Sequence, residues 1–137
     1  MEHTIDVNWK HNMAFETEIN GHKLTMDGSA AMGGDDKGPR PKPLMLAALA
    51  GCTGIDVILI LKKMRITPDN FNIRVTSPLT DEEPKHYTSM HIIYEFWGKD
   101  LALDKLEKAV QLSQDKYCGV SYMYRKAMDI TYEIVVR

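Results

Sequence analysis

The stretch "LAGCTGIDVILILKKMR", residues 49–65, decides the fold, because it is a long apolar run interrupted by one cysteine and one aspartate. Cys52 and Asp56 are four residues apart, and this spacing places both side chains on one face of a helix. The run is preceded by Pro43, which suits the first turn of a helix because it gives up only an unpaired N–H. We therefore predict a helix over 43–64 that is apolar on nearly all sides and buried for most of its length.

The same run has an alternative interpretation as a membrane span, since residues 44–61 are about as long as a bilayer-spanning helix. Asp56 lies near the middle of that span, where an unpaired charge costs about 3 kcal/mol on insertion scales. We therefore favour a central helix of a soluble protein and predict no membrane partner. The first ten residues, "MEHTIDVNWK", lack a basic segment followed by an apolar one, so we expect no secretory signal.

The composition is that of one ordinary globular domain spanning residues 1–137. Hydrophobic residues make up 44% and charged residues 26%, which excludes a disordered chain. The net charge of −2 offers little attraction for nucleic acid, so we predict no nucleic-acid partner. Two cysteines in a chain without an export signal indicate a reducing compartment, and we predict a cytoplasmic location.

Alternating apolar and polar residues predict strands on both sides of the central helix. Asn20-Gly21 is a strong hairpin signal, so the first strands are expected to form a meander. A loop rich in glycine and proline follows at 28–43. The strands are predicted at 3–9, 13–19, 22–28, 70–78, 87–97 and 128–136, and a second helix at 103–116. The order is therefore βββ-α-ββ-α-β, an α+β protein.

The second predicted helix is amphipathic and ends just before the other cysteine. Leu103, Leu106 and Val110 fall on one face, and Gln114 is the next residue on that face. Cys118 then precedes a segment in which a new helical turn could begin. The exposed N–H groups at such a helix start would stabilise a thiolate.

Each cysteine taken alone is better explained by packing than by reactivity, since unpaired cysteines are often buried. Gly51, Thr53 and Gly54 lower helix stability around Cys52, which makes sense if a helix or a ligand approaches closely there. Two helices packed on a common sheet could bring Cys52 and Cys118 together. One thiol that attacks a peroxide and a second that condenses with the sulfenic acid are the minimum equipment of a thiol peroxidase.

The sequence predicts no cofactor and no metal site. Neither cysteine belongs to a C-x-x-C pair, and no paired zinc-binding pattern is present. A metal site could still assemble in three dimensions, but the linear spacing of ligands does not predict one.

Two motifs resemble those of the osmotically inducible protein C and organic hydroperoxide resistance family (OsmC/Ohr). The stretch "PKPLMLAALAGCT", residues 41–53, is similar to the family's proline-led helix that enters an alanine-rich run before its first cysteine. The stretch "YCGVS", residues 117–121, is similar to its second "C-P-x-S" motif. The 66-residue spacing of Cys52 and Cys118 also fits the family, and the match covers nearly the whole chain.

The resemblance implies an intertwined homodimer in which long central helices are buried between two antiparallel sheets. It makes Cys52 the peroxidatic cysteine and Cys118 the resolving cysteine. It also implies organic hydroperoxides, or another apolar small molecule, as the ligand, and a dithiol as the reductant.

The charged partners of the family's thiol are replaced in this chain. Lys42 stands ten residues before Cys52, where an active family member carries a glutamate that holds a catalytic arginine, and no arginine precedes Arg40. We therefore take Arg40 and Lys42 as possible charge partners. Asp56 would disfavour a thiolate nearby, and we expect it to pair with a lysine or an arginine. The alternative function is a dimeric small-molecule-binding module without peroxidase activity.

Overall fold

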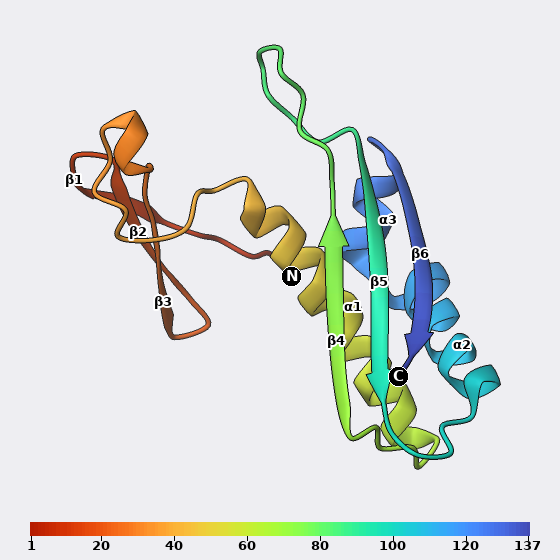
Figure 1. Ribbon diagram of the computed structural model, residues 1–137. Coiled ribbons are helices and arrows are strands. Elements are labelled where there is room, and N and C mark those ends of the chain that lie inside the picture. Colours follow the sequence, from red (N-terminus) through yellow and green to blue (C-terminus); the bar gives the residue numbers. More distant parts are fainter. The chain divides into compact units, whose positions relative to one another are not determined.

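The computed structural model describes residues 1–137, which form two compact units, Met1–Met45 and Leu46–Arg137 (Figure 1). The first unit is a meander of three antiparallel strands in the order β1-β2-β3. These strands are β1 (Val7–His11), β2 (Ala14–Ile19) and β3 (His22–Met26). Asn20 and Gly21, between β2 and β3, have φ angles of 51° and 82°, as a tight hairpin turn requires. The predicted meander and its turn are confirmed.

The loop after β3 is organised around Asp27. The carboxylate of Asp27 accepts hydrogen bonds from the backbone N–H groups of Gly28 and Lys37, at 2.7 and 3.0 Å. A short 3₁₀ turn, η1 (Ala30–Met32), lies between these donors. The loop predicted at 28–43 is therefore an ordered turn closed over one buried carboxylate.

The central helix is α1 (Pro43–Lys63), close to the predicted 43–64. Its buried residues recur every fourth position, at Leu49, Thr53, Val57 and Leu61. The prediction of a helix buried on nearly all sides is wrong for the single chain, because only this stripe is fully buried. By length and composition alone α1 could cross a membrane, although its buried stripe packs into the protein core.

The second sheet has the order β4-β5-β6. Its strands are β4 (Asn70–Thr76), β5 (Ser89–Trp97) and β6 (Asp129–Val136). β4 and β5 are antiparallel, whereas β5 and β6 are parallel, so the prediction of purely antiparallel sheets is wrong here. The parallel pair arises because the chain returns to the starting end of β5 through a helical crossover.

The crossover contains three helical segments, whereas one helix at 103–116 and a possible new turn after Cys118 were predicted. They are α2 (Leu103–Leu112), a π-helical turn η2 (Ser113–Tyr117) and α3 (Gly119–Arg125). The predicted amphipathic helix covers α2 and most of η2. The short helix α3 begins directly after Cys118, where the sequence indicated that a new turn could start.

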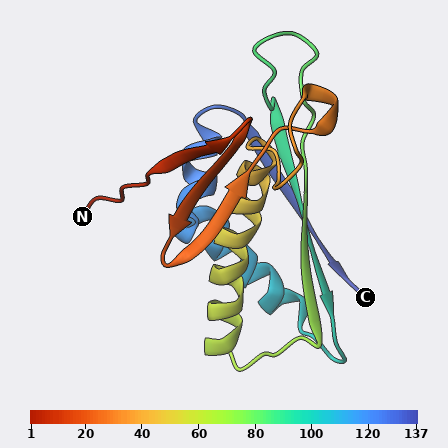
Figure 2. The ribbon, with the colours of Figure 1, turned by 90° about the vertical axis from the view of Figure 1, so that its left-hand side faces the viewer.

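The helices of the second unit lie on one face of the β4-β5-β6 sheet (Figure 2). Alternate residues of β5 supply the sheet side of the core, and α1 and α2 supply the helix side. The fully buried apolar residues are Met90, Ile92, Tyr94 and Phe96 from β5, with Leu49, Val57, Leu61, Leu106, Ala109 and Val110 from the helices. This core fixes α1 and the crossover side by side.

The close approach that Gly54 indicated is present. A Cβ atom on Gly54 would lie 2.9 Å from the Cδ1 atom of Ile73, so the glycine admits a side chain of β4. The neighbour is thus a strand residue, neither a second helix nor a ligand.

Candidate functional site

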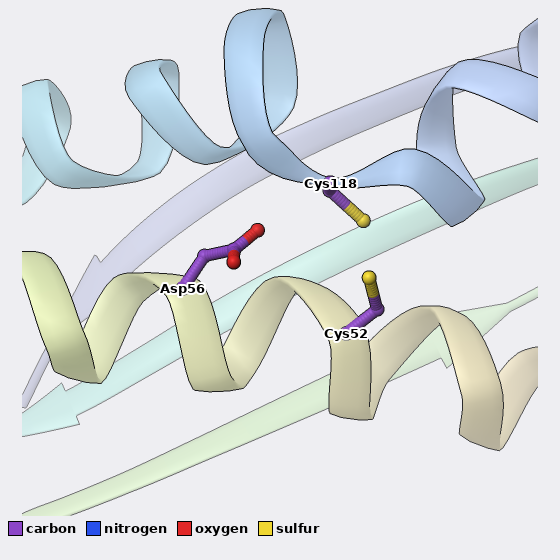
Figure 3. Close-up of side chains that lie close together, drawn as sticks. All are labelled: Cys52, Asp56 and Cys118. Atoms are coloured by element: carbon purple, nitrogen blue, oxygen red, sulfur yellow. The ribbon is translucent and has the colours of Figure 1, made fainter. Parts of the chain in front are cut away.

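The two cysteines, 66 residues apart in sequence, are neighbours in the structure. Cys52 lies on α1 and Cys118 caps the N-terminus of α3, and their side chains point toward each other (Figure 3). Their sulfur atoms are within 4.8 Å of one another, and both cysteines are free thiols. The expectation that two elements packed on one sheet bring these thiols together is confirmed.

Cys118 is almost fully buried, at 3% exposure. Its sulfur accepts hydrogen bonds from the backbone N–H of Ser121 at 3.4 Å and from the hydroxyl of Ser121 at 3.2 Å. The three-residue spacing of the "C-G-V-S" motif produces this cap, because the third N–H of a helix points back at the capping side chain. The serine of the motif therefore fixes the orientation of the buried thiol.

Cys52 is partly exposed, and its pKa is raised above the ordinary value of 9.0. Burial is the largest cause. The backbone N–H of Val120 donates to the sulfur and lowers the pKa, while the Cys118 thiol and the Asp56 carboxylate raise it. The surroundings of Cys52 within this unit therefore favour the protonated thiol over the thiolate.

The Asp56 carboxylate is the third group of the site, and its oxygen lies within 4.8 Å of both sulfurs. It accepts a hydrogen bond of 3.0 Å from the hydroxyl of Ser113. The predicted pairing of Asp56 with a lysine or an arginine is wrong within this unit. The hydroxyl of Ser113, on the crossover, donates to one oxygen of the Asp56 carboxylate instead, so the partner of the carboxylate is neutral.

A buried polar network holds Ser113 in place. The hydroxyl of Thr53 is 2.7 Å from the hydroxyls of both Ser113 and Tyr94. The amide of Gln114 donates to Tyr94 at 2.7 Å and to Thr53 at 3.3 Å. Burial, the main cause, raises the pKa of Tyr94 to about 12, so this hydroxyl stays protonated. The network ends at Arg125, which donates to the backbone and side-chain oxygens of Gln114.

Sequence reasoning missed most of this network. Gln114 gave the one available signal, because it is a polar residue on the apolar face of the predicted helix. Such a residue needs buried hydrogen-bond partners. Tyr94 and Ser113 follow no motif, and their partners lie 20 or more residues away in sequence.

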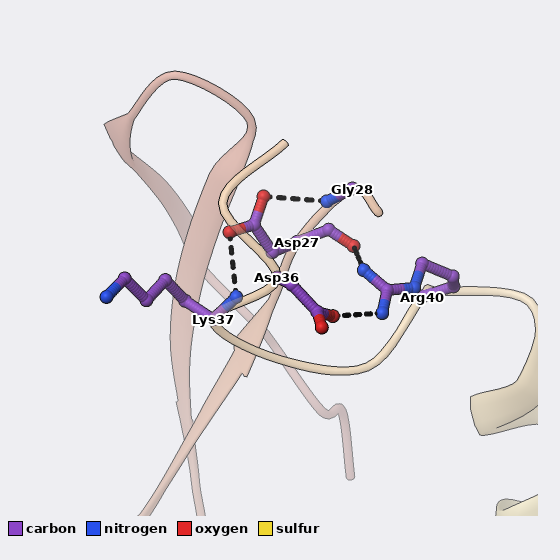
Figure 4. Close-up of polar contacts among 5 residues, drawn as sticks. All are labelled: Asp27, Gly28, Asp36, Lys37 and Arg40. Carbon is purple, nitrogen blue, oxygen red and sulfur yellow. Dashed lines mark hydrogen bonds and ion pairs between the residues drawn. The ribbon is translucent and has the colours of Figure 1, made fainter. Parts of the chain in front are cut away.

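Arg40 and Lys42, the possible charge partners, belong to the first unit. The Arg40 guanidinium bonds to the Asp36 carboxylate and donates to the backbone oxygen of Asp27 at 3.2 Å (Figure 4). The backbone N–H of Lys37, more than any other group, lowers the pKa of Asp27. A role for Arg40 or Lys42 toward Cys52 stays a prediction.

A long apolar helix, a mixed sheet and two facing thiols define a class of α+β proteins. Other proteins similar to this chain are known. The sequence profile of the family described as OsmC-like protein matches residues 34–133, and the chain belongs to the OsmC family. Protein YhfA of Escherichia coli (strain K12) is 36% identical over 132 residues, which cover 94% of this chain and 96% of YhfA. This membership was predicted from the two cysteine motifs and is confirmed.

Solved structures show the same fold. A hypothetical protein from Aquifex aeolicus VF5 has a TM-score of 0.83 at 28% identity, covering 100% of this chain and 99% of that one. The organic hydroperoxide resistance protein OhrB of Bacillus subtilis has a TM-score of 0.65 at 21% identity, covering 96% and 98%. The higher identity to YhfA than to OhrB fits a divergent OsmC-like branch.

Proposed function

We propose that the protein is a thiol-dependent peroxidase that reduces organic hydroperoxides through Cys52 and Cys118. The observation that carries the proposal is the approach of the two sulfurs to within 4.8 Å. Membership of the OsmC family supports a redox or peroxide-related role in general, including a role in stress protection. The resemblance stated above adds organic hydroperoxides as the substrate class.

The difference in burial between the two thiols supports the roles proposed for them. Cys52 is partly exposed, so a peroxide reaches its sulfur more easily than that of Cys118. The Cys52 thiolate attacks the O–O bond, and with one proton this gives a sulfenic acid and an alcohol. The Cys118 thiol then condenses with the sulfenic acid, releasing water and forming a disulfide. A dithiol returns both cysteines to the reduced state.

The attack requires a thiolate, and the surroundings of Cys52 within its unit oppose one. Burial and the Asp56 carboxylate raise the pKa of Cys52, and the Val120 N–H only partly offsets this. The proposal therefore includes a cation that stabilises the thiolate in the working protein. Arg40 and Lys42 are the candidates, since they stand in the stretch that leads into α1.

We propose further that the working form is a homodimer in the cytoplasm. The side of α1 opposite its buried stripe carries three exposed apolar residues, Ile55, Ile58 and Leu59. Gly51 lies on the same side, and a Cβ atom there would meet nothing within 4 Å. A partner that covers this apolar face would remove it from water, which is favourable by roughly 25 cal/mol per Å². Sedimentation of the wild type as a dimer, and of Ile58→Glu as a monomer, is the expected result, and a wild-type monomer at micromolar concentration would contradict it.

The first experiment mixes reduced, metal-free protein with stoichiometric cumene hydroperoxide or hydrogen peroxide and counts free thiols over time. The proposal expects loss of both thiols and faster loss with the organic peroxide. Cys118→Ser should lose one thiol and accumulate a sulfenic acid, whereas Cys52→Ser should be inert. Equal rates for Cys52→Ser and the wild type would sink the proposal.

A second candidate function, a binding module for an apolar small molecule, is favoured by the raised pKa of Cys52. The replacement of the family's glutamate by Lys42 points the same way. Slow thiol loss with both oxidants in a folded dimer would select this function over the peroxidase.

A further inference from the structure

Two thiols and one carboxylate converge in the space between α1 and the crossover. The sulfurs of Cys52 and Cys118 and a carboxylate oxygen of Asp56 all lie within 4.8 Å of one another (Figure 3). Peroxide reduction needs the two thiols but gives no role to Asp56, because a carboxylate repels the thiolate nucleophile. The presence of Asp56 at this point therefore needs a different explanation.

We propose that Cys52, Asp56 and Cys118 form a binding site for one zinc ion. Three atoms separated by at most 4.8 Å have a common point no farther than about 2.8 Å from each. Zinc binds thiolate sulfur at about 2.3 Å and carboxylate oxygen at roughly 2.0–2.2 Å. Each sulfur thus needs to close by at most about 0.5 Å and the oxygen by at most about 0.8 Å, which is within the reach of small rotations about the χ angles.

The ligand set selects the metal. Two thiolates favour soft or borderline ions over Mg²⁺ and Ca²⁺, and a carboxylate as third ligand suits Zn²⁺ better than Cu⁺. Three protein ligands leave one tetrahedral position for water or a small molecule. Binding displaces one proton from each thiol into the solvent, because zinc is bound by thiolates. The doubly positive ion then offsets two of the three negative charges of the two thiolates and the carboxylate.

Hydrogen bonds from the surrounding residues hold the proposed ligands in place. The hydroxyl of Ser113 binds one oxygen of Asp56 at 3.0 Å and is itself fixed by Thr53. The N–H and hydroxyl of Ser121 bind the Cys118 sulfur. Metal ligands in proteins are oriented by such outer partners, whose loss typically weakens metal binding 10- to 100-fold. Because Cys52 and Asp56 are one turn apart on α1, the helix backbone itself sets their separation.

The zinc site stands independently of the proposed peroxidase activity, although it uses the same thiols. Zinc-bound sulfurs are not free to form a disulfide, so the metal-bound and oxidised states exclude each other. A protein that binds zinc but is inert toward peroxides would keep this inference and overturn the proposed function. A peroxidase with no affinity for zinc would do the reverse.

The test titrates reduced, metal-free protein with Zn²⁺ against a chromophoric chelator. The expected result is one ion per chain. Asp56→Asn should bind at least about tenfold more weakly, since the loss of a direct ligand costs no less than the loss of an outer partner. Glu107→Gln, on the exposed face of α2, is the matched control and should bind like the wild type. Wild-type protein with both thiols alkylated should bind no zinc.

A second measurement needs no variant, so it does not depend on how well Asp56→Asn folds. Added Zn²⁺ should slow the reaction of both wild-type thiols with a thiol reagent, and Co²⁺ should give the intense absorption of a sulfur–cobalt bond. Absence of zinc uptake by the wild type would overturn the site. Equal affinity in the alkylated protein, or in folded Asp56→Asn, would also overturn it.

Discussion

Two aspartates, Asp27 in the first unit and Asp56 in the second, have contrasting surroundings. Asp27 is only 2% exposed, and its two carboxylate oxygens accept backbone N–H groups from Gly28 and Lys37. Asp56 is half-buried, accepts one hydroxyl hydrogen bond and faces two thiols. A carboxylate that is saturated by backbone donors stabilises a loop. A carboxylate with one donor and two sulfur neighbours retains the capacity to bind a ligand.

The two aspartates also differ in how far away in the sequence their hydrogen-bond donors lie. The donors of Asp27 come from within ten residues, whereas Ser113 reaches Asp56 across 57 residues. The first arrangement is a local turn, and the second exists only in the folded unit. Three substitutions, ordered from the largest expected effect to the smallest, test this difference.

Thr53→Val should give the largest loss of stability, about 2–4 kcal/mol in the free energy of unfolding. Valine removes the hydroxyl that bonds to Tyr94, Ser113 and Gln114, and it leaves those buried groups short of partners. Urea denaturation measures the change, with Thr88→Val on the surface as the control. Equal stability of the two variants would show that the long-range network does not support the Asp56 region.

Asp27→Asn should lower the melting temperature at neutral pH by several degrees, because an amide cannot accept both N–H groups as an anion does. The folded pKa of Asp27 is below its ordinary value of 3.8, chiefly through the Lys37 N–H. Its stabilising contribution is therefore present above pH 3.8 and is lost as the pH falls through the lower, folded pKa. The difference between wild type and Asp27→Asn should shrink in the same range.

Asp36→Asn, which removes only the exposed partner of Arg40, is the control for Asp27→Asn. Asp36→Asn should lower the melting temperature only slightly, since exposed ion pairs contribute about 0–1 kcal/mol to stability. A larger loss for Asp36→Asn than for Asp27→Asn would contradict the assignment of Asp27 as the structural carboxylate.

Asp56→Asn should have the smallest effect on stability of the metal-free protein, less than about 1 kcal/mol, because the amide oxygen still accepts the Ser113 hydrogen bond. The main effect of Asp56→Asn is expected on the reactivity of Cys52. Removing the carboxylate removes one of the lesser causes of the raised pKa of Cys52, so alkylation of Cys52 at neutral pH should become faster, by at most about two- to threefold. Mass spectrometry of Cys52 labelling against pH measures this, and an unchanged profile would rule out an electrostatic effect of Asp56 on the thiol.

The features that the sequence predicted are those with a local cause. The apolar run fixed α1 to within one residue, and Asn20-Gly21 fixed the first hairpin. The segment after Cys118 was expected to begin a new helical turn, and α3 begins there. In each case the residues that determine the structure are adjacent in the chain.

The features that the sequence did not predict depend on the crossover. A strand pattern carries no information about direction, so the parallel pairing of β6 with β5 could not be derived from it. The break between α2 and η2 at Ser113 follows no periodicity. The Asp56–Ser113 bond depends on both, and for that reason a cationic partner was expected in place of a serine.

The parallel β5–β6 pair has a kinetic consequence. The segment between these strands, residues 98–128, carries Ser113 and Cys118, so the site is complete only after this whole crossover has docked. Pairings between distant residues form slowly, because a long loop must close before the contacts stabilise it. We therefore expect the two thiols to become neighbours late in folding, when β6 joins the sheet. The time at which Cys118 becomes protected from a fast thiol reagent would then show when a newly made chain completes its last folding step and becomes a functional protein.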